Sequence, residues 1–131
     1  MRRVAGGILG MVVLLAVAAT MKAQRGDRPL EWLPAADSLP ANMVTLVVLD
    51  DGTRAPVDHP LVCQPDGGWM IGMADGRLRF GGASMPDTVR IRILGPFHEP
   101  RAVSFTWAEA HGRAVIVTLA RRTGARVEPD C

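Results

Sequence analysis

The three histidines are the side chains of this sequence with the clearest capacity for acid–base chemistry or metal binding. His59, His98 and His111 each stand beside turn-forming residues, and no two of them have the close spacing with which a helix or hairpin presents a metal. Folding could still bring His59 and its neighbour Asp58 close to His98 and Glu99. Without that convergence we expect three solvated loop histidines, and we predict neither a metal site nor a cofactor.

The serines and glycine pairs do not form a recognisable reaction centre either. Ser38, Ser84 and Ser104 lack the glycine-flanked turn between a strand and a helix that exposes a hydrolase nucleophile. The glycine pairs at 67–68 and 81–82 are typical of hairpin turns, because no helix follows them whose N-terminus could hold a phosphate. The sequence therefore predicts a protein that is not an enzyme.

Cys63 and Cys131 are the only cysteines, and they are candidates for a disulfide. An exported protein meets an oxidising compartment, where a single pair of cysteines is commonly bridged. In the chain-entropy account, closing a loop of about 70 residues stabilises a fold by about 4 kcal/mol. In the alternative interpretation, Cys63 is a buried core thiol, and Cys131 stays free or links to another chain.

Residues 1–23 indicate where the protein works. Arg2 and Arg3 precede an uncharged run over residues 4–21, which ends at Lys22. A helix over this run would be about 27 Å long, slightly shorter than the roughly 30 Å hydrocarbon core of a bilayer, and small residues near its end suit a signal peptidase. We predict either a cleaved signal peptide or a retained single-pass anchor that contacts the membrane through residues 4–21. Both interpretations place the rest of the chain outside the cytoplasm, in the periplasm or cell envelope.

The charge of the chain beyond this leader argues against a nucleic-acid partner. The whole sequence has a formal net charge of +2, but Arg2, Arg3 and Lys22 belong to the leader. The rest of the chain carries 12 arginines against 13 acidic residues. Nucleic-acid binding requires a dense basic patch and commonly aromatic stacking residues, so we predict no nucleic-acid partner.

Beyond the leader, the chain divides into three segments. Residues 24–42 contain Pro29, Pro34 and Pro40 and are predicted to be a linker rather than a strand. Residues 43–120 consist of short apolar runs broken by turn residues about every ten residues, which is typical of an all-β domain. Residues 121–131 follow as a C-terminal tail.

Seven short strands are expected in the all-β domain, at residues 44–49, 61–64, 69–73, 77–80, 89–93, 101–107 and 114–119. The clearest is 89–93, where apolar residues alternate with Arg90 and Arg92, as in a strand with one buried face. Turn signals such as Asp51-Gly52 separate the strands. The pattern predicts a seven-stranded antiparallel β-sandwich, preceded by one N-terminal hydrophobic helix.

The order of strands and turns between residues 44 and 119 is similar to that of a known family. The strand 44–48 is followed by Asp51-Gly52 and Pro56-Val57, and later by the segment 75–80. Further on come a strand at 88–93 and a segment running from Gly95 through an aromatic residue to Arg101. Together they resemble the carboxypeptidase regulatory-like domain of the transthyretin-like superfamily. The resemblance implies a domain without chemistry, because such domains commonly serve as rigid appendages, spacers or docking modules.

Enzymes with related sandwiches have motifs that this chain lacks. Intradiol dioxygenases hold iron with two tyrosines and two histidines, and the sequence contains no tyrosine. Hydroxyisourate hydrolases end in a Tyr-Arg-Gly-Ser motif, whereas this chain has Arg-Arg-Thr-Gly at residues 121–124. The resemblance therefore disfavours both activities.

Two tryptophans and four arginines are the candidates for an interface. Trp32 and Trp69 are predicted anchors of a protein contact, with core packing or docking of the linker as the alternative, whereas alternation places Trp107 in the core. The arginines stand opposite apolar residues in their strands and are Arg77, Arg79, Arg90 and Arg92. They form either a solvated sheet face or a docking face for an acidic partner or phospholipid head groups.

These observations together favour a role in binding. We expect a non-catalytic extracytoplasmic accessory or structural subunit that acts through protein–protein contacts. If the leader is retained, it tethers this subunit to a larger membrane-associated complex. The alternative is a carbohydrate- or peptide-binding module of the cell envelope.

Overall fold

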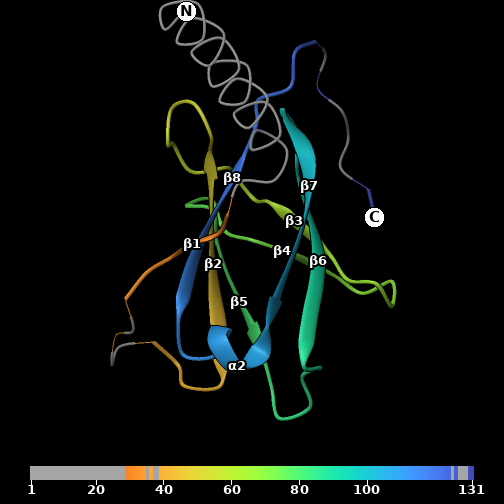
Figure 1. Ribbon diagram of the computed structural model, residues 1–131. Helices are drawn as coiled ribbons and strands as arrows, with labels where there is room; N and C mark the ends of the chain where they lie inside the picture. The colour runs from red at the N-terminus through yellow and green to blue at the C-terminus, as the bar shows by residue number, and fades with distance from the viewer. Residues whose placement is uncertain (1–28, 35, 37–38, 125, 127–129) are drawn as a thin grey trace, which may run out of the picture.

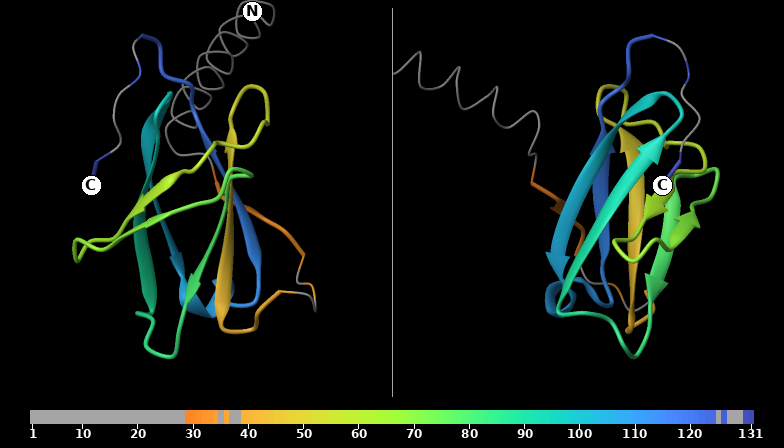
Figure 2. Two further views of the ribbon diagram at one scale, coloured as in Figure 1. Left: turned by 180° about the vertical axis from the view of Figure 1, so that it is seen from behind. Right: turned by 90° about the vertical axis from the view of Figure 1, so that its right-hand side faces the viewer.

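Two four-stranded β-sheets make up almost all of the structure, a computed structural model that describes residues 29–34, 36, 39–124, 126 and 130–131. Figure 1 shows the longer strands running lengthwise, with the short helix α2 (Trp107–Ala110) closing one end of the molecule. The side view in Figure 2 shows the two sheets stacked one behind the other. The prediction of an all-β, sandwich-like fold is confirmed.

The first sheet has the strand order β1-β8-β2-β5. It consists of β1 (Glu31–Trp32), β8 (Ala114–Leu119), β2 (Met43–Asp50) and β5 (Arg77–Gly81). Side chains alternate across each strand, so β2 buries Val44, Leu46 and Val48 while β5 exposes its arginines.

The second sheet has the strand order β4-β3-β6-β7. Its strands are β4 (Trp69–Ile71), β3 (Leu61–Cys63), β6 (Thr88–Gly95) and β7 (His98–Thr106). As the sequence predicts, β6 buries Val89, Ile91 and Ile93 and exposes Arg90 and Arg92. The turn between β3 and β4 extends beyond the rest of this sheet (Figures 1 and 2).

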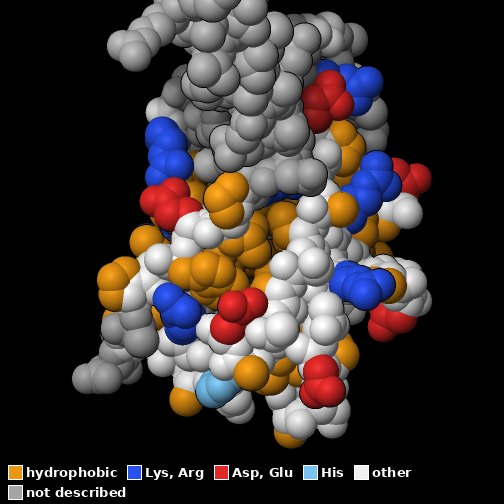
Figure 3. Space-filling view, viewed as in Figure 1, with side chains coloured by type: hydrophobic (Ala, Val, Ile, Leu, Met, Phe, Trp, Pro, Cys, Tyr) orange, Lys and Arg blue, Asp and Glu red, His pale blue; other side chains and the backbone are white. Residues whose placement is uncertain are grey.

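The core lies between the sheets and is built from the inward side chains of β2, β3, β5, β6, β7 and β8. Leu30 and Trp32 pack against this core from the segment that precedes β2. On the side drawn in Figure 3, hydrophobic side chains gather at the centre, over β1 and β8, and charged side chains surround them. The core is therefore continuous with an apolar area at this side of the sandwich.

The predicted strand count and strand direction both need correction. An eighth strand, β1, lies within the predicted linker and pairs antiparallel with β8 through Glu31–Ile116 and Trp32–Val115. The two central strands of the first sheet, β2 and β8, run parallel rather than antiparallel. They do so because the chain enters β8 at the end of the sandwich where β2 begins, with Thr45 N–H donating to the Arg113 carbonyl oxygen at 3.0 Å.

The end of β7 also differs from the prediction, which extended this strand through Trp107. The strand stops at Thr106, and one helical turn, α2, follows. Glu109 Oε1 accepts the backbone N–H of Thr106 at 3.1 Å, which stabilises the helix start in the manner of a capping box. Trp107 still packs against the core from this helix.

The turns follow the glycine and aspartate signals of the sequence. Gly76, between β4 and β5, has a φ of 77°, and a Cβ added there would collide with the Val48 carbonyl oxygen. Only glycine suits both constraints at this position.

The predicted N-terminal hydrophobic helix and the leader, residues 1–23, lie outside the described residues. In the part of the chain that the structure describes, no helix has the length and apolar character needed to cross a membrane.

Candidate functional site

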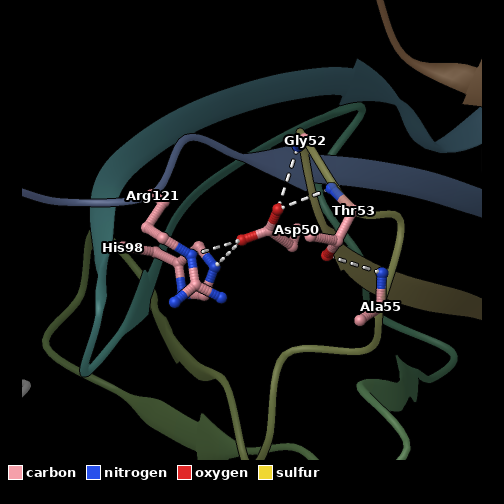
Figure 4. Close-up of polar contacts among 6 residues, drawn as sticks. All are labelled: Asp50, Gly52, Thr53, Ala55, His98 and Arg121. Carbon is pink, nitrogen blue, oxygen red and sulfur yellow. Dashed lines mark hydrogen bonds and ion pairs between the residues drawn. The ribbon is translucent and has the colours of Figure 1, made fainter.

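The best-organised polar cluster surrounds Asp50, at the end of the sandwich opposite α2. Asp50 is the last residue of β2, and its Oδ1 accepts the backbone N–H groups of Gly52 and Thr53, both at 2.9 Å. Its Oδ2 lies 2.7 Å from Nε2 of His98, the first residue of β7, and 3.4 Å from Nε of Arg121. Figure 4 shows His98 and Arg121 on one side of the carboxylate and the turn on the other.

These donors hold the pKa of Asp50 well below its usual range. The backbone N–H of Thr53 has the largest effect, followed by the His98 side chain, while burial opposes both and the Gly52 N–H adds a smaller effect. Asp50 is therefore ionised at neutral pH although its side chain is only 4% exposed.

The arrangement fixes which ring nitrogen of His98 donates to Asp50. An ionised carboxylate can only accept hydrogen bonds, so Nε2 of His98 carries the hydrogen that it donates to Asp50. The other ring nitrogen, Nδ1, is buried without a hydrogen-bond partner. It faces the backbone at Gly95, where an added Cβ would lie 3.2 Å from it.

This cluster joins the two sheets, because Asp50 belongs to the first and His98 to the second. Backbone hydrogen bonds reinforce the junction: Glu99 N–H donates to the Ala120 carbonyl oxygen and Arg122 N–H to the Phe97 carbonyl oxygen, both at 2.8 Å. The chain leaving β8 therefore pairs with the start of β7. A histidine–carboxylate pair of this kind can orient and stabilise, and Nδ1 of His98 has no hydrogen-bond partner among the described residues.

Sequence reasoning did not pair Asp50 with His98. One signal was present: Asp50 continues the alternation of Val44, Leu46 and Val48, which places a charged residue on the buried face of β2. A buried carboxylate requires a partner. Nothing in the sequence singles out His98, because 48 positions separate the two residues.

The expectation of three solvated histidines is wrong for His98, which is 8% exposed. His59 and His111 are exposed, with His59 Nδ1 at 2.8 Å from Asp58 Oδ1 and His111 Nδ1 at 3.0 Å from the Ala41 carbonyl oxygen. His98 is paired with Asp50 rather than with Asp58. Among the described residues, no three His, Cys, Asp or Glu side chains gather closely enough to hold a metal ion.

A hollow of about 550 Å³ lies beside β4, on the outer side of the second sheet. Its apolar walls include Leu61, Trp69, Ile71 and Pro96. Its polar walls are Asp58, His59, Arg126 and Asp130, with Cys131 beside them. The C-terminal tail, which begins beyond β8, thus forms one side of this hollow.

Large apolar side chains are exposed around the hollow. The exposed fraction is 62% for Trp69, 55% for Ile71, 66% for Met73 and 48% for Phe97. Trp69 and Ile71 share the outer face of β4, while Met70 between them packs against the core. We refer to Trp69, Ile71, Met73 and Phe97, together with the hollow, as the β4 surface.

The two candidate interface tryptophans have different environments. Trp69 is exposed on β4, whereas Trp32 is partly buried on β1 in the other sheet. The Trp32 ring meets Phe105 edge-on with centroids 5.7 Å apart, and the Arg113 guanidinium lies 5.2 Å from its centroid. Trp32 therefore connects the sheets, and only Trp69 is placed to receive a partner.

The four candidate arginines are all exposed, but they do not form one face. Arg77 and Arg79 lie on β5 of the first sheet, and Arg90 and Arg92 lie on β6 of the second. Among the described residues, Arg77 of this group forms a long ion pair, with its Nε 3.8 Å from Asp75 Oδ2.

Comparison with known proteins assigns no role to these sites. No family model matches the chain, and no curated protein matches it. The resemblance to the carboxypeptidase regulatory-like domain stays a prediction, since the two sheets do not single out one superfamily.

The cysteine pair links the tail to the second sheet. The sulfur atoms of Cys63 and Cys131 lie at disulfide distance, 1.96 Å, and their Cα atoms are 5.6 Å apart. Arg126 of the tail lies 5.8 Å from the centroid of the Phe97 ring. A paired arrangement of the cysteines is compatible with an oxidising location outside the cytoplasm.

Proposed function

We propose that this protein is a non-catalytic accessory subunit that works outside the cytoplasm and binds another protein through the β4 surface. The observation that carries the proposal is that four large apolar side chains are exposed and that two of them, Trp69 and Ile71, line a hollow. Contiguous exposed apolar area of this kind marks an interaction site on a soluble domain.

The composition of the β4 surface suits a protein partner. Tryptophan is among the residues that most often dominate the free energy of a protein interface, particularly near a pocket from which water is excluded. Trp69 stands at the rim of the hollow, and Ile71 and Leu61 continue the apolar wall. Polar groups at Asp58, His59 and Asp130 supply the rim that such interfaces usually have.

The environment of the Asp50–His98 pair supports the absence of catalysis. Both oxygens of Asp50 are already engaged, and Nδ1 of His98 is enclosed within the fold. An acid–base catalyst must reach a reacting group with its free nitrogen. The pair therefore serves to join the sheets.

A position outside the cytoplasm follows from the leader sequence and agrees with the cysteine pairing. The leader either is removed or tethers the domain to a membrane complex. The resemblance to carboxypeptidase regulatory-like domains supports the same role, because those domains commonly serve as docking modules.

Site-specific photo-crosslinking tests the proposal. A photoreactive amino acid replaces Ile71 in one variant and Arg79, an exposed residue on the other sheet, in a control variant. We expect irradiation of the native cells to yield one discrete protein adduct, identified by mass spectrometry, from position 71 and none from position 79. Absence of an adduct at position 71, or equal adducts at both positions, would contradict the proposal.

The hollow also favours a second candidate, a carbohydrate- or peptide-binding module of the cell envelope. Its volume of about 550 Å³ lies within the range of small-ligand sites, and an exposed tryptophan beside carboxylates can stack on a sugar ring. A glycan array decides between the candidates. Specific retention that is lost on Trp69→Ala would support the carbohydrate-binding module, and no retention would favour the accessory subunit.

A further inference from the structure

We propose that the partner presents an extended segment with at least one basic side chain, and that this segment adds to the second sheet as a strand alongside β4. The inference rests on the proposed function and specifies how the β4 surface would bind. Strand addition supplies affinity through main-chain hydrogen bonds and specificity through pockets for alternate side chains.

The backbone of β4 has free hydrogen-bonding groups on its open side. In the antiparallel β3–β4 pair, Gln64 N–H donates to the Gly68 carbonyl oxygen and Gly72 N–H donates to the Pro60 carbonyl oxygen. Met70, which lies two residues from both Gly68 and Gly72, therefore points its N–H and C=O groups toward β3 as they do. Trp69 and Ile71 have the opposite parity, so their N–H and C=O groups point toward the open edge. Among the described residues, no backbone group outside β3 bonds to them.

The other sheet edges are protected in ways that β4 is not. Charged side chains and proline commonly prevent unwanted strand pairing at an edge. β1 begins with Glu31, β5 projects Arg77 and Arg79, and β7 contains Pro100. β4 consists of Trp-Met-Ile and has neither a charge nor a proline. It is therefore the edge suited to receive a strand.

The β4 surface can also accommodate the alternate side chains of an added strand. Trp69 and Ile71 project to the same outer face, where the hollow lies. Every second side chain of an adjacent strand would project to that face as well. Such side chains would cover Trp69 and Ile71 and enter the hollow between β4 and the tail.

The charge around β4 indicates the charge of the segment. Asp66 lies just before β4, Asp75 just after it, and Asp58 and Asp130 line the hollow. The cation of the hollow, Arg126, lies over Phe97. Asp66 Oδ1 accepts the Gly68 N–H and has no cationic partner among the described residues. Asp58 is paired with His59 and Asp75 with Arg77, so it is Asp66 that is complementary to a lysine or arginine on the segment.

Binding of defined peptides tests the inference on the unaltered protein. Displayed random 12-residue peptides are selected on the purified mature protein, and the strongest binder is synthesised. We expect selected peptides to alternate apolar residues and to contain lysine or arginine. Their affinity is then measured by calorimetry, with the Trp69→Ala variant as the check that they bind at the β4 surface.

Backbone methylation distinguishes strand addition from side-chain docking. Two forms of the synthetic peptide carry N-methyl groups on alternate amides, in the two opposite parities. Because only one parity faces β4, we expect one form to lose about tenfold or more in affinity and the other to bind as the parent does. Equal effects of both forms would overturn the inference, and so would a selection that yields no binder.

A substitution in the protein provides a second readout. Ile71→Pro removes an outward N–H, and we expect it to weaken the peptide by about tenfold more than Ile71→Ala does. Arg79→Pro removes an outward N–H from β5 and serves as the matched control, which should bind normally. Equal affinities of Ile71→Pro and Ile71→Ala would overturn strand addition.

The outcomes separate this inference from the function on which it rests. If the Trp69→Ala variant binds the peptides more weakly but both N-methylated forms bind with equal affinity, strand addition is wrong and protein binding at the β4 surface stands. If position 71 gives no crosslinked protein in native cells, the proposed function itself fails.

Discussion

At the scale of single residues, the structure depends most on one buried carboxylate. Asp50 receives two backbone N–H groups from the turn that follows it and one hydrogen from His98. It thereby fixes the turn and ties β2 to β7 at the same time. Its contribution is structural, and it can be measured separately from binding.

Removing this carboxylate should destabilise the fold strongly. We expect Asp50→Ala to lower the free energy of unfolding by about 3 to 5 kcal/mol, because it leaves buried partners without their acceptor. Asp58→Ala is the control, since Asp58 forms an exposed pair with His59 and its loss should cost less than about 1 kcal/mol. Urea unfolding measures both. Similar losses in the two variants would show that Asp50 does not join the sheets.

The same carboxylate predicts a sensitivity to acid. The pKa of Asp50 is lower in the folded state than the value of about 3.9 typical of an unfolded chain, so its stabilisation is present above that value and is lost as the pH falls below it. The difference in unfolding free energy between the wild type and Asp50→Asn should therefore be largest near neutral pH and should shrink below about pH 4. Urea titrations across that range measure it, and a constant difference would contradict the assignment.

Residue roles were only partly accessible from the sequence. Alternation identified the buried faces of β5 and β6, because side-chain period is a local property. The partner of Asp50 was not accessible, since a contact across the sandwich leaves no mark in the local pattern. The same limit explains why Trp32 and Trp69 could not be told apart before their strands were placed.

At the scale of elements, the short strand β1 matters more than its length suggests. It extends the first sheet beyond β8 and places Trp32 against Phe105 of the second sheet. Leu33 N–H continues the pairing by donating to the Ala114 carbonyl oxygen at 3.0 Å. The segment before β2 is thus part of the packed domain.

A pair of tryptophan substitutions tests this difference between elements. Trp32→Ala should lower the unfolding free energy by about 2 to 3 kcal/mol, less than for a fully buried ring but with loss of the Phe105 and Arg113 contacts. Trp69→Ala should leave thermal stability almost unchanged, because its ring is mostly exposed. Calorimetric melting compares them. Equal destabilisation would mean that Trp69 also supports the core.

All seven strands expected from alternation are present, and the additional strand was missed for a physical reason. A two-residue strand is too short to have a period, and Pro29 and Pro34 on either side favour an irregular chain. Strand direction was missed because alternation is the same in parallel and antiparallel pairs. The turn that ends β7 did have a signal, a threonine three positions before a glutamate, at 106 and 109.

At the scale of the whole molecule, the cysteine pair determines where the tail lies. It joins residues separated by 68 positions and brings Cys131 onto β3, beside the hollow. The sequence predicts a leader, a domain and a tail from their different compositions. The predicted pairing of Cys63 with Cys131 fixes the position of the tail, and the structure places the two sulfur atoms at disulfide distance.

Opening this link should affect both stability and the hollow. We expect Cys131→Ser to lower the unfolding free energy by about 4 kcal/mol, the loop-closure value for a separation of this size. The variant should also weaken peptide binding, since Arg126 and Asp130 would no longer be held beside Trp69. Mass spectrometry of the wild type before and after reduction should give a difference of two hydrogens. An unchanged mass with two alkylatable thiols would contradict the link.

The parallel pairing of β2 with β8 dictates when this protein can fold. A ribosome or a translocation channel that releases the chain from its N-terminus delivers β2 long before its central neighbour, which ends at Leu119. In that interval β2 can pair with its antiparallel neighbour β5 but lacks its parallel neighbour β8. Pairings between distant segments also form slowly. The first sheet therefore cannot form its central strand pair until nearly the entire length of the domain has emerged.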